Sequence, residues 1–447
     1  MSDPKGAAPL NATIKLGWAI GELPVAAFVV LQMAFMLFYC TEALQIPPAI
    51  AGVALLVPRL LDAFADPLMG ALSDRTRSPM GRRRLYLLLG APALAIAFGL
   101  VFFVPAEAPL ALKTGLLIAS FMASNAAVTI YEVPYSAMAA EMTASYTERT
   151  SLTGYKMFAA RFGGVVIAFG APAIFGSQPT LVEGFRLLGA SVGVFILATG
   201  LWAFYATAKA PRIETTPARF SVRDEVQAVL ENRSFCILWI AFLLQNLAIG
   251  AAATTLIYFV TQVMLVSPQQ AGLFMASGGV VAALATPAWV WLGRRIGKRL
   301  GYFIGLTIAA LSAIPALVLA PGQAQILLAV LIIAGLGDAA TQLFPNAMAP
   351  DTVEIDELRS GLRREGAIFG AWGFCRKLGM TGGAFIVSLA LAAFHFTPGA
   401  PAAAQASEAI LGIRLIYAAA PLSLWLAAMF AFSRYDLTEA RFEAIKS

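Results

Sequence analysis

A series of long apolar segments limits what this chain can fold into more than any other feature of its sequence. A helix needs about 20 apolar residues to cross the hydrocarbon core of a bilayer, and twelve segments reach roughly that length. Glycine and proline interrupt several of them, which spanning helices tolerate. We therefore expect an all-α membrane protein with twelve transmembrane helices. The predicted helices are 17–41, 47–73, 84–105, 112–140, 151–177, 184–208, 233–264, 270–293, 299–320, 322–348, 365–394 and 410–433.

The composition supports the same interpretation. Of the 447 residues, 59% are hydrophobic and 13% are charged, whereas a soluble globular domain has about 25% charged residues. These polar residues are too few to cover the apolar ones in water, so a lipid bilayer is the expected surrounding. The net charge of +6 does not indicate nucleic-acid binding, because the basic residues gather in short connections. Cys40, Cys236 and Cys375 lie in apolar runs and are expected to be free core residues.

Lysine and arginine alternate between the connections. The odd-numbered connections hold few, Lys113 and Arg186 being the main exceptions. Because positively charged loops stay in the cytoplasm, we expect both termini and the even connections on the cytoplasmic side of the plasma (inner) membrane. The basic residues of the even connections are Arg75, Arg77, Arg82, Arg83 and Arg84 after the second run, Lys209, Arg212, Arg219, Arg223 and Arg233 after the sixth, Arg294, Arg295, Lys298 and Arg299 after the eighth, and Arg359, Arg363 and Arg364 after the tenth.

The polar stretch in the middle of the chain divides it into two halves. We predict an N-terminal six-helix half at 1–208, a cytoplasmic linker at 209–232, and a C-terminal six-helix half at 233–447 that ends in a cytoplasmic tail. A basic motif follows the second helix of each half, at 81–84 and at 293–299. Two pseudo-symmetric six-helix halves are the architecture of the major facilitator fold, in which the substrate binds near the midplane of the membrane.

The second predicted helix carries three charged residues. A carboxylate at the centre of a spanning helix costs about 2.5–3.5 kcal/mol on insertion, so Asp62 and Asp66 are functional candidates. They are four residues apart and share one helix face, where they repel each other unless a proton or a cation lies between them. We interpret them as a cation-coupling site, which would be a metal site if the ion is sodium. The alternatives are that Arg59 neutralises one of them in a structural pair, or that the group lies close to the cytoplasm.

The fourth predicted helix offers further oxygen ligands. Pro134 leaves a backbone carbonyl near Ile130 without its helical partner. This carbonyl, the Thr129 hydroxyl and the Glu132 carboxylate are hard ligands that suit a small hard cation. Alternatively, Glu132 binds the substrate.

The eleventh predicted helix carries Arg376 and Lys377 between apolar residues. A buried lysine needs a partner, and the carboxylates of the second helix are the obvious one; the alternative is that either basic side chain extends towards an interface. Trp372, one turn earlier, offers a surface on which a sugar ring could stack. Three more charges lie within apolar runs. They are Glu22 in the first helix, and Arg161 and Asp338, which could pair across the halves.

Several motifs resemble those of the glycoside–pentoside–hexuronide:cation symporter family. They are the segments 59–70, 131–135, 148–152, 350–354 and 364–366, in the family's order and across nearly the whole chain. The resemblance implies the major facilitator fold and the uptake of sugars driven by Na⁺, H⁺ or Li⁺. The lysolipid symporters of eukaryotes share the motif of the second helix.

The resemblance also implies roles for single residues. Asp62 and Asp66 match the carboxylates that bind the cation, and Thr129 matches a cation ligand. Glu132 matches a sugar-binding acid, and Lys377 matches the lysine of the eleventh helix. Glu22 stands where many members carry an acid.

The chain departs from the family's pattern at three positions. Ala65 stands at the position of an asparagine that supplies a cation ligand. Ser136 and Gln342 stand at positions of tryptophans that face the sugar. A proton needs only a carboxylate, whereas sodium needs several oxygens.

The sequence therefore predicts a symporter that couples H⁺ or Na⁺ to a sugar or glycoside by alternating access. It needs no other cofactor, and we expect it to act as a monomer. A lysolipid or another amphipathic solute is the alternative substrate. A membrane-embedded enzyme is a distant alternative, because one histidine and scattered cysteines form no catalytic group; we therefore predict that the chain is not an enzyme.

Overall fold

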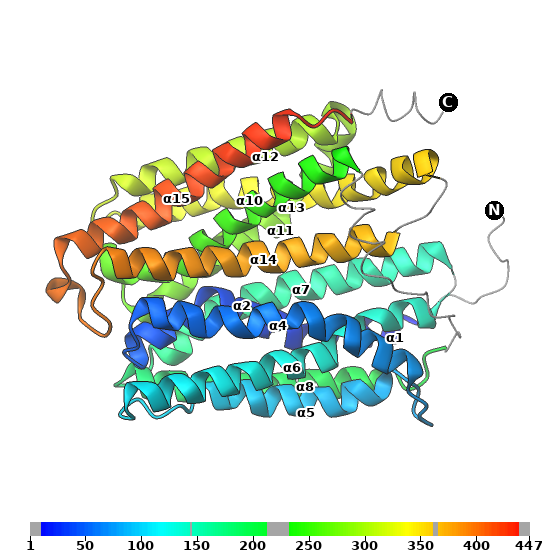
Figure 1. The fold of residues 1–447 in the computed structure, drawn as a ribbon, viewed down its shortest axis with the longest axis horizontal. Coiled ribbons are helices and arrows are strands. Elements are labelled where there is room, and N and C mark those ends of the chain that lie inside the picture. The colour runs from blue at the N-terminus through cyan, green and yellow to red at the C-terminus, as the bar shows by residue number, and fades with distance from the viewer. Residues whose placement is uncertain (1–9, 144, 212–231, 361–364, 438–447) are drawn as a thin grey trace. The chain divides into compact units, whose positions relative to one another are not determined.

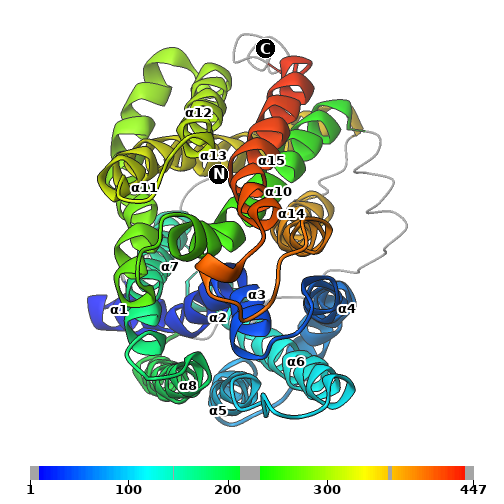
Figure 2. The ribbon, with the colours of Figure 1, turned by 90° about the vertical axis from the view of Figure 1, so that its left-hand side faces the viewer.

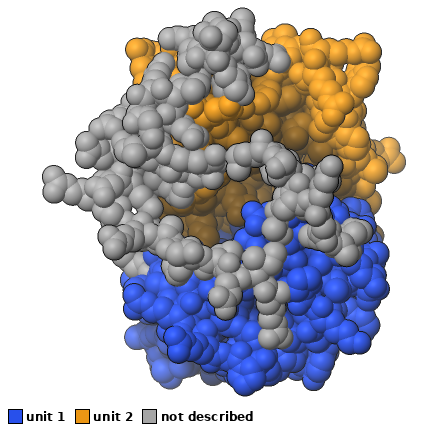
Figure 3. Space-filling model, turned by 90° about the vertical axis from the view of Figure 1, so that its right-hand side faces the viewer, with its two compact units in different colours: residues 1–218 blue, residues 219–447 orange. Residues whose placement is uncertain are grey.

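The computed structural model describes residues 10–143, 145–211, 232–360 and 365–437, except the side chains of 62–64, 146–147, 355–360 and 365–367. All long elements in these residues are helices (Figure 1). They form two compact units, Met1–Ala218 and Arg219–Ser447, coloured separately in Figure 3. Twelve helical segments are long and apolar enough to cross a membrane. The twelve helices predicted from the sequence are thus confirmed. Most of the predicted linker, 212–231, lies outside the described residues.

Unit 1 holds the first six spans. Its elements are α1 (Ala12–Ile20), α2 (Leu23–Ala34), α3 (Met36–Phe38), the π-helix η1 (Tyr39–Ala43), α4 (Pro48–Arg75), α5 (Arg84–Val101), α6 (Leu110–Met142), α7 (Tyr146–Phe175) and α8 (Leu181–Ala206). Helix α5 lies between α6 and α8 (Figure 2), α4 packs on α6, and α2 packs on α7. Small residues allow the close approach. A side chain at Gly90 would meet the Tyr131 backbone at 3.0 Å.

Unit 2 holds the other six spans. Its elements are α10 (Arg233–Tyr258), the π-helix η2 (Phe259–Val263), α11 (Pro268–Ile296), α12 (Lys298–Ala313), the 3₁₀-helix η3 (Ile314–Leu317), α13 (Ala324–Ser360), α14 (Glu365–Ala393), the 3₁₀-helix η4 (Ala402–Ala404) and α15 (Ser407–Ser433). Helix α10 packs on both α14 and α15, and α13 packs on α11 and α12.

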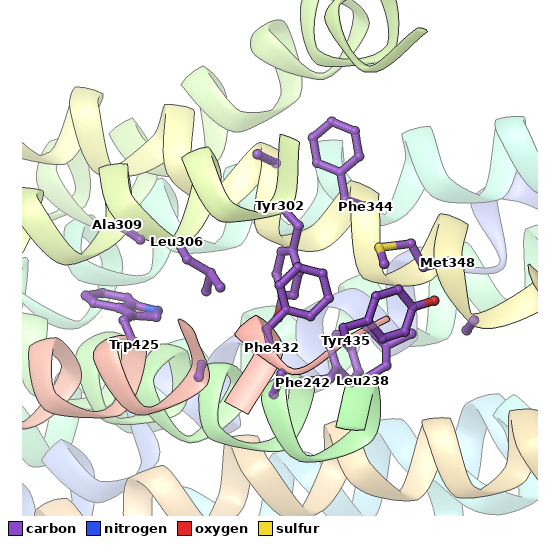
Figure 4. Close-up of a cluster of buried hydrophobic side chains, with 14 of the residues drawn as sticks. Leu238, Phe242, Tyr302, Leu306, Ala309, Phe344, Met348, Trp425, Phe432 and Tyr435 are labelled. Carbon is purple, nitrogen blue, oxygen red and sulfur yellow. The ribbon is translucent and has the colours of Figure 1, made fainter. Parts of the chain in front are cut away.

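A cluster of large side chains forms the core of unit 2. It joins α10, α12, α13 and α15, and Figure 4 shows Tyr302, Phe344, Trp425 and Phe432 within it. Tyr302 is fully buried, and its hydroxyl donates a hydrogen bond of 2.7 Å to Gln245 Oε1. Burying a polar group inside such a core requires this kind of partner.

The first span of each unit ends in the same way. Each runs into a π-helix, followed by a residue with a positive φ angle: 52° at Gln45 and 56° at Leu265. The next helix then begins at a proline, Pro48 in unit 1 and Pro268 in unit 2. Proline suits the first helical position, where no N–H partner is needed.

The basic motifs that follow the second span of each unit also share a local structure. A glycine with a positive φ, Gly81 or Gly297, makes the turn. In unit 1, Arg83 then pairs with Glu141 of α6 at 2.7 Å; in unit 2, Lys298 pairs with Asp351 of α13 at 2.7 Å. In both units the carboxylate lies on the fourth span, so the faint repeat in the sequence corresponds to a repeated contact.

Candidate functional site

The first span of unit 1 is broken where it carries its acidic residue. Helix α1 ends at Ile20 and α2 begins at Leu23, so Gly21 and Glu22 lie between the two helices. Pro24 explains part of the break, because its nitrogen has no hydrogen to donate to the preceding turn. The backbone carbonyls around the break can also take hydrogen-bond partners from elsewhere in the protein, as the Trp18 carbonyl does in addition to the Gly21 N–H.

Two tyrosines of α6 supply these partners. Tyr131 donates from its hydroxyl to the Gly21 carbonyl at 2.8 Å, and Tyr135 donates to the Trp18 carbonyl at 2.9 Å. The Trp18 ring stacks on Tyr135, with 5.1 Å between centroids. Since all three rings are buried, α6 fixes the break and thereby the position of Glu22.

Glu22 faces a lysine of α7. The Lys156 Nζ lies 3.4 Å from Glu22 Oε2, donates to Ser136 Oγ of α6 at 2.8 Å, and lies 5.2 Å from the centre of the Tyr135 ring. Glu132 of α6 is half-buried and lies one turn before Ser136 on the same helix. Three helices thus bring an acid, a base and a hydroxyl together within the membrane-spanning part of unit 1.

The residues predicted to bind the cation meet in the same unit. Thr129 of α6 donates from its hydroxyl to Asp66 Oδ1 of α4 at 3.1 Å. Thr129 is buried and Asp66 half-buried. The Thr129 oxygen keeps lone pairs for a cation after donating its hydrogen. The Asp62 side chain, one turn before Asp66, lies outside the described residues.

Arg59 of α4 contacts two residues of helix α2. Its Nη2 donates to Gln32 Oε1 of α2, and its guanidinium lies 5.5 Å from the centre of the Phe28 ring. Helix α4 is therefore tied to the second part of the broken span through Arg59.

The other predicted residues are spread over both units. Arg161 on α7 and Arg376 on α14 are exposed, and Lys377 is half-buried. The pairings expected for Lys377 and for Arg161 with Asp338 would join the two units and stay predictions. The Trp372 ring stacks on Phe242 at 4.0 Å and donates from Nε1 to Asn346 Oδ1 at 2.8 Å. The residue is 6% exposed, so at most part of its second face remains for the stacking that we expected.

The sequence interpretation missed Lys156, Gln32 and the role of the two tyrosines. Lys156 is the only lysine in the apolar run 151–177, and this isolation was a usable signal. Its neighbours Glu22 and Ser136 are 134 and 20 positions away in the sequence, so only the packing of α2, α6 and α7 brings them together.

The chain is similar to known proteins over nearly its whole length. A family model described as MFS/sugar transport protein matches residues 17–439. A putative glycoside/cation symporter of Escherichia coli (strain K12) is 30% identical, with 96% of this chain and 93% of the relative covered. An uncharacterized symporter of Synechocystis is 27% identical, with 98% of this chain and 97% of the relative covered.

Among solved structures, the chain is similar to a bacterial homolog of the human lysosomal transporter Spinster, in an inward-facing and occupied conformation. The TM-score is 0.72 at 16% identity, with 96% of this chain and 97% of that chain covered. At this identity the likeness concerns the fold alone, and it confirms the predicted fold class.

Proposed function

This chain belongs to the MFS/sugar transport protein family and is an integral membrane transporter, not an enzyme; from this premise we propose that it is a cation-coupled symporter for a sugar or glycoside. The resemblance to the glycoside–pentoside–hexuronide:cation symporters is confirmed by the family match and by relatives named as a glycoside/cation symporter and a glucuronide carrier homolog.

The contact between Thr129 and Asp66 carries the proposal of cation coupling. It joins a carboxylate and a hydroxyl from two spans at 3.1 Å, in a region where an uncompensated charge is costly. A proton or a sodium ion at Asp66, with Asp62 one turn away, neutralises that charge. Binding of the cation then favours binding of the substrate, and the coupling is reciprocal.

The cluster of Glu22, Lys156 and Ser136 supports a sugar or glycoside as the substrate. Sugar hydroxyls both donate and accept hydrogen bonds, and this cluster offers a carboxylate acceptor beside an ammonium donor. Glu132 adds a second acceptor from the same helix as Ser136. In this proposal Lys377, Arg376 and the second face of Trp372 are further contacts from unit 2.

We further propose that the protein acts as a monomer by alternating access in the plasma (inner) membrane. Both termini then lie in the cytoplasm, as the distribution of lysine and arginine predicts.

The test is accumulation of labelled glycosides by proteoliposomes under imposed pH or sodium gradients. Asp66→Asn should abolish accumulation against a gradient, because an amide neither exchanges a proton nor balances a cation, while exchange of substrate across the membrane persists. Glu107→Gln, which changes an exposed carboxylate in the connection before α6, serves as the matched control. Normal accumulation by Asp66→Asn would show that the carboxylate is structural.

A further inference from the structure

A half-open cavity of about 250 Å³ is lined by α10, α11, α12, α13 and α15 of unit 2. For comparison, an apolar cavity of about 150 Å³ is large enough to bind benzene. The lining residues belong to candidate membrane spans, and most of them are alanine, glycine or branched aliphatic residues. The cavity therefore suits a compact apolar group somewhat larger than a single ring.

Two aliphatic hydroxyl groups in this cavity are left as hydrogen-bond acceptors. Ser312 donates its one hydrogen to the Ala309 carbonyl at 2.8 Å, and Thr341 donates to the Asp338 carbonyl at 3.1 Å. A hydroxyl has one hydrogen and two lone pairs, so both oxygens still accept. A ligand that contacts these two oxygens must bring donors.

Asp338 gives the cavity a negatively charged wall. Its half-buried carboxylate lines the same space as the two hydroxyls. Asp338 also interacts with the protein, but a carboxylate has about four acceptor positions and can serve a ligand as well. Inside a membrane span, a cationic partner would lower the cost of this charge.

Two aromatic side chains complete the site. Tyr417 and Trp425 of α15 line the cavity, and each is 8% exposed; Trp425 stands beside Ala309 at one end of the cluster in Figure 4. Aromatic rings attract cations through their faces. The buried Trp425 Nε1 has no hydrogen-bond partner among the described residues, which is unusual for a buried N–H. A bound water would satisfy it.

We propose that unit 2 contains a binding site for a small organic ammonium compound with an apolar or aromatic body. The ammonium group supplies the three donors that Asp338, Ser312 and Thr341 require, and the body fills the apolar part of the cavity. A sugar would leave its many hydroxyls against alanine and glycine, and Asp338 would repel an anion. All residues that line the site belong to unit 2.

Calorimetric titration of the purified protein tests the proposal with two matched probes, 2-phenylethylamine and its neutral analogue 2-phenylethanol. The amine should bind at least about tenfold more tightly than the alcohol, as expected for charge-assisted hydrogen bonds. Asp338→Asn should remove this preference. Asp351→Asn, on the same helix but not in the lining of the cavity, should retain it.

A second variant tests the location. An added Cβ at Gly278 would lie 3.5 Å from the Leu331 carbonyl oxygen, which is ordinary contact, so Gly278→Leu can place its side chain in the cavity without displacing the backbone. It should abolish binding of both probes while the melting temperature stays near that of the wild type. Equal binding of amine and alcohol, an amine preference that survives in Asp338→Asn, or undiminished binding by folded Gly278→Leu would overturn the proposal. Because the measurement is of binding, its outcome does not depend on whether the chain is a sugar symporter.

Discussion

At the scale of single residues, the hydroxyl of Thr129 offers the sharpest test of the cation site. Thr129→Val keeps the shape of the side chain but removes the oxygen that faces Asp66. We expect the half-saturating cation concentration to rise about tenfold, as for the loss of one hydrogen bond to a charged group. Thr129→Ser retains the oxygen and should behave like the wild type. If the Thr129→Val and Thr129→Ser variants transport substrate with the same cation dependence, Thr129 is not a cation ligand.

Variants of Lys156 and Glu22 can separate the structural role of this pair from its role in substrate binding. Lys156→Met leaves the Glu22 carboxylate largely buried, with 12% of its side chain exposed, and without its lysine. Removing one partner of a buried pair costs about 3–5 kcal/mol, so the melting temperature should fall. The double variant Lys156→Met/Glu22→Gln should recover most of it, since no unpaired charge remains.

Substrate binding should not recover with stability in that double variant. The neutral pair lacks both the carboxylate acceptor and the ammonium donor that the sugar hydroxyls would use. Equilibrium binding of a labelled glycoside, measured beside thermal melting, distinguishes the two roles. A double variant that melts and binds like the wild type would show that the pair contributes neither to stability nor to substrate binding.

The sequence indicated some of these residues and not others, for a physical reason. Asp66, Thr129 and Glu22 attract attention because polar groups are costly inside apolar helices, and this cost can be read locally. The partner of Glu22 cannot be read in this way. Lys156 and Ser136 reach it only through the packing of three helices, so the position of Lys156 in its own apolar run does not indicate Glu22 as its partner.

At the scale of elements, small residues set how closely the helices approach. Helices α10 and α14 meet at glycines: an added Cβ at Gly383 would lie 2.4 Å from the Leu247 carbonyl oxygen. Gly383→Ala should therefore force the helices apart and destabilise unit 2 by about 1–3 kcal/mol. On the same helix, Gly373 has nothing within 4 Å of the added atom. Gly373→Ala should leave thermal stability unchanged or slightly raised. Equal melting of the two variants would contradict this packing.

The first span shows what sequence periodicity does not reveal about an element. The apolar run 17–41 predicts one continuous helix, but the structure has a break at Gly21–Glu22 and a π-helix at Tyr39–Ala43. Pro24 indicates a weak point. Tyr131 and Tyr135 of another helix donate hydrogen bonds to carbonyls at the break, so the geometry depends on tertiary contacts that hydropathy does not encode.

At the scale of the whole molecule, the number of spans and the fold class could be predicted from the sequence, because both depend on the number of long apolar runs. Each span can be recognised from the length of its own apolar run. The alternation of basic connections provides an independent check on the number of spans. The positions at which helices approach, and hence the cluster around Glu22, depend on shape and on small residues at contacts. These could not be predicted from hydropathy.

The orientation in the membrane can be tested with two exposed serines. Ser177 lies between α7 and α8, in a connection predicted to face outwards, and Ser433 ends α15 on the predicted cytoplasmic side. A membrane-impermeant thiol reagent added to intact cells should label Ser177→Cys and not Ser433→Cys. Lysis should make Ser433→Cys reactive. The native background should be low, since Cys40 and Cys375 are buried and Cys236 is half-buried. The opposite pattern would invert the topology.

The joint in the first span is held by groups that carry no net charge: two phenol hydroxyls and two backbone carbonyls. A membrane voltage acts on charges, at about 2.3 kcal/mol per elementary charge per 100 mV, and exerts no such force on these hydrogen bonds. The charges at the joint are those of Glu22 and of Lys156, whose Nζ lies 3.4 Å from Glu22 Oε2. Because these two charges are opposite and close together, the forces that a voltage exerts on them largely cancel, and the bend should be nearly the same in an energised cell and in a detergent micelle.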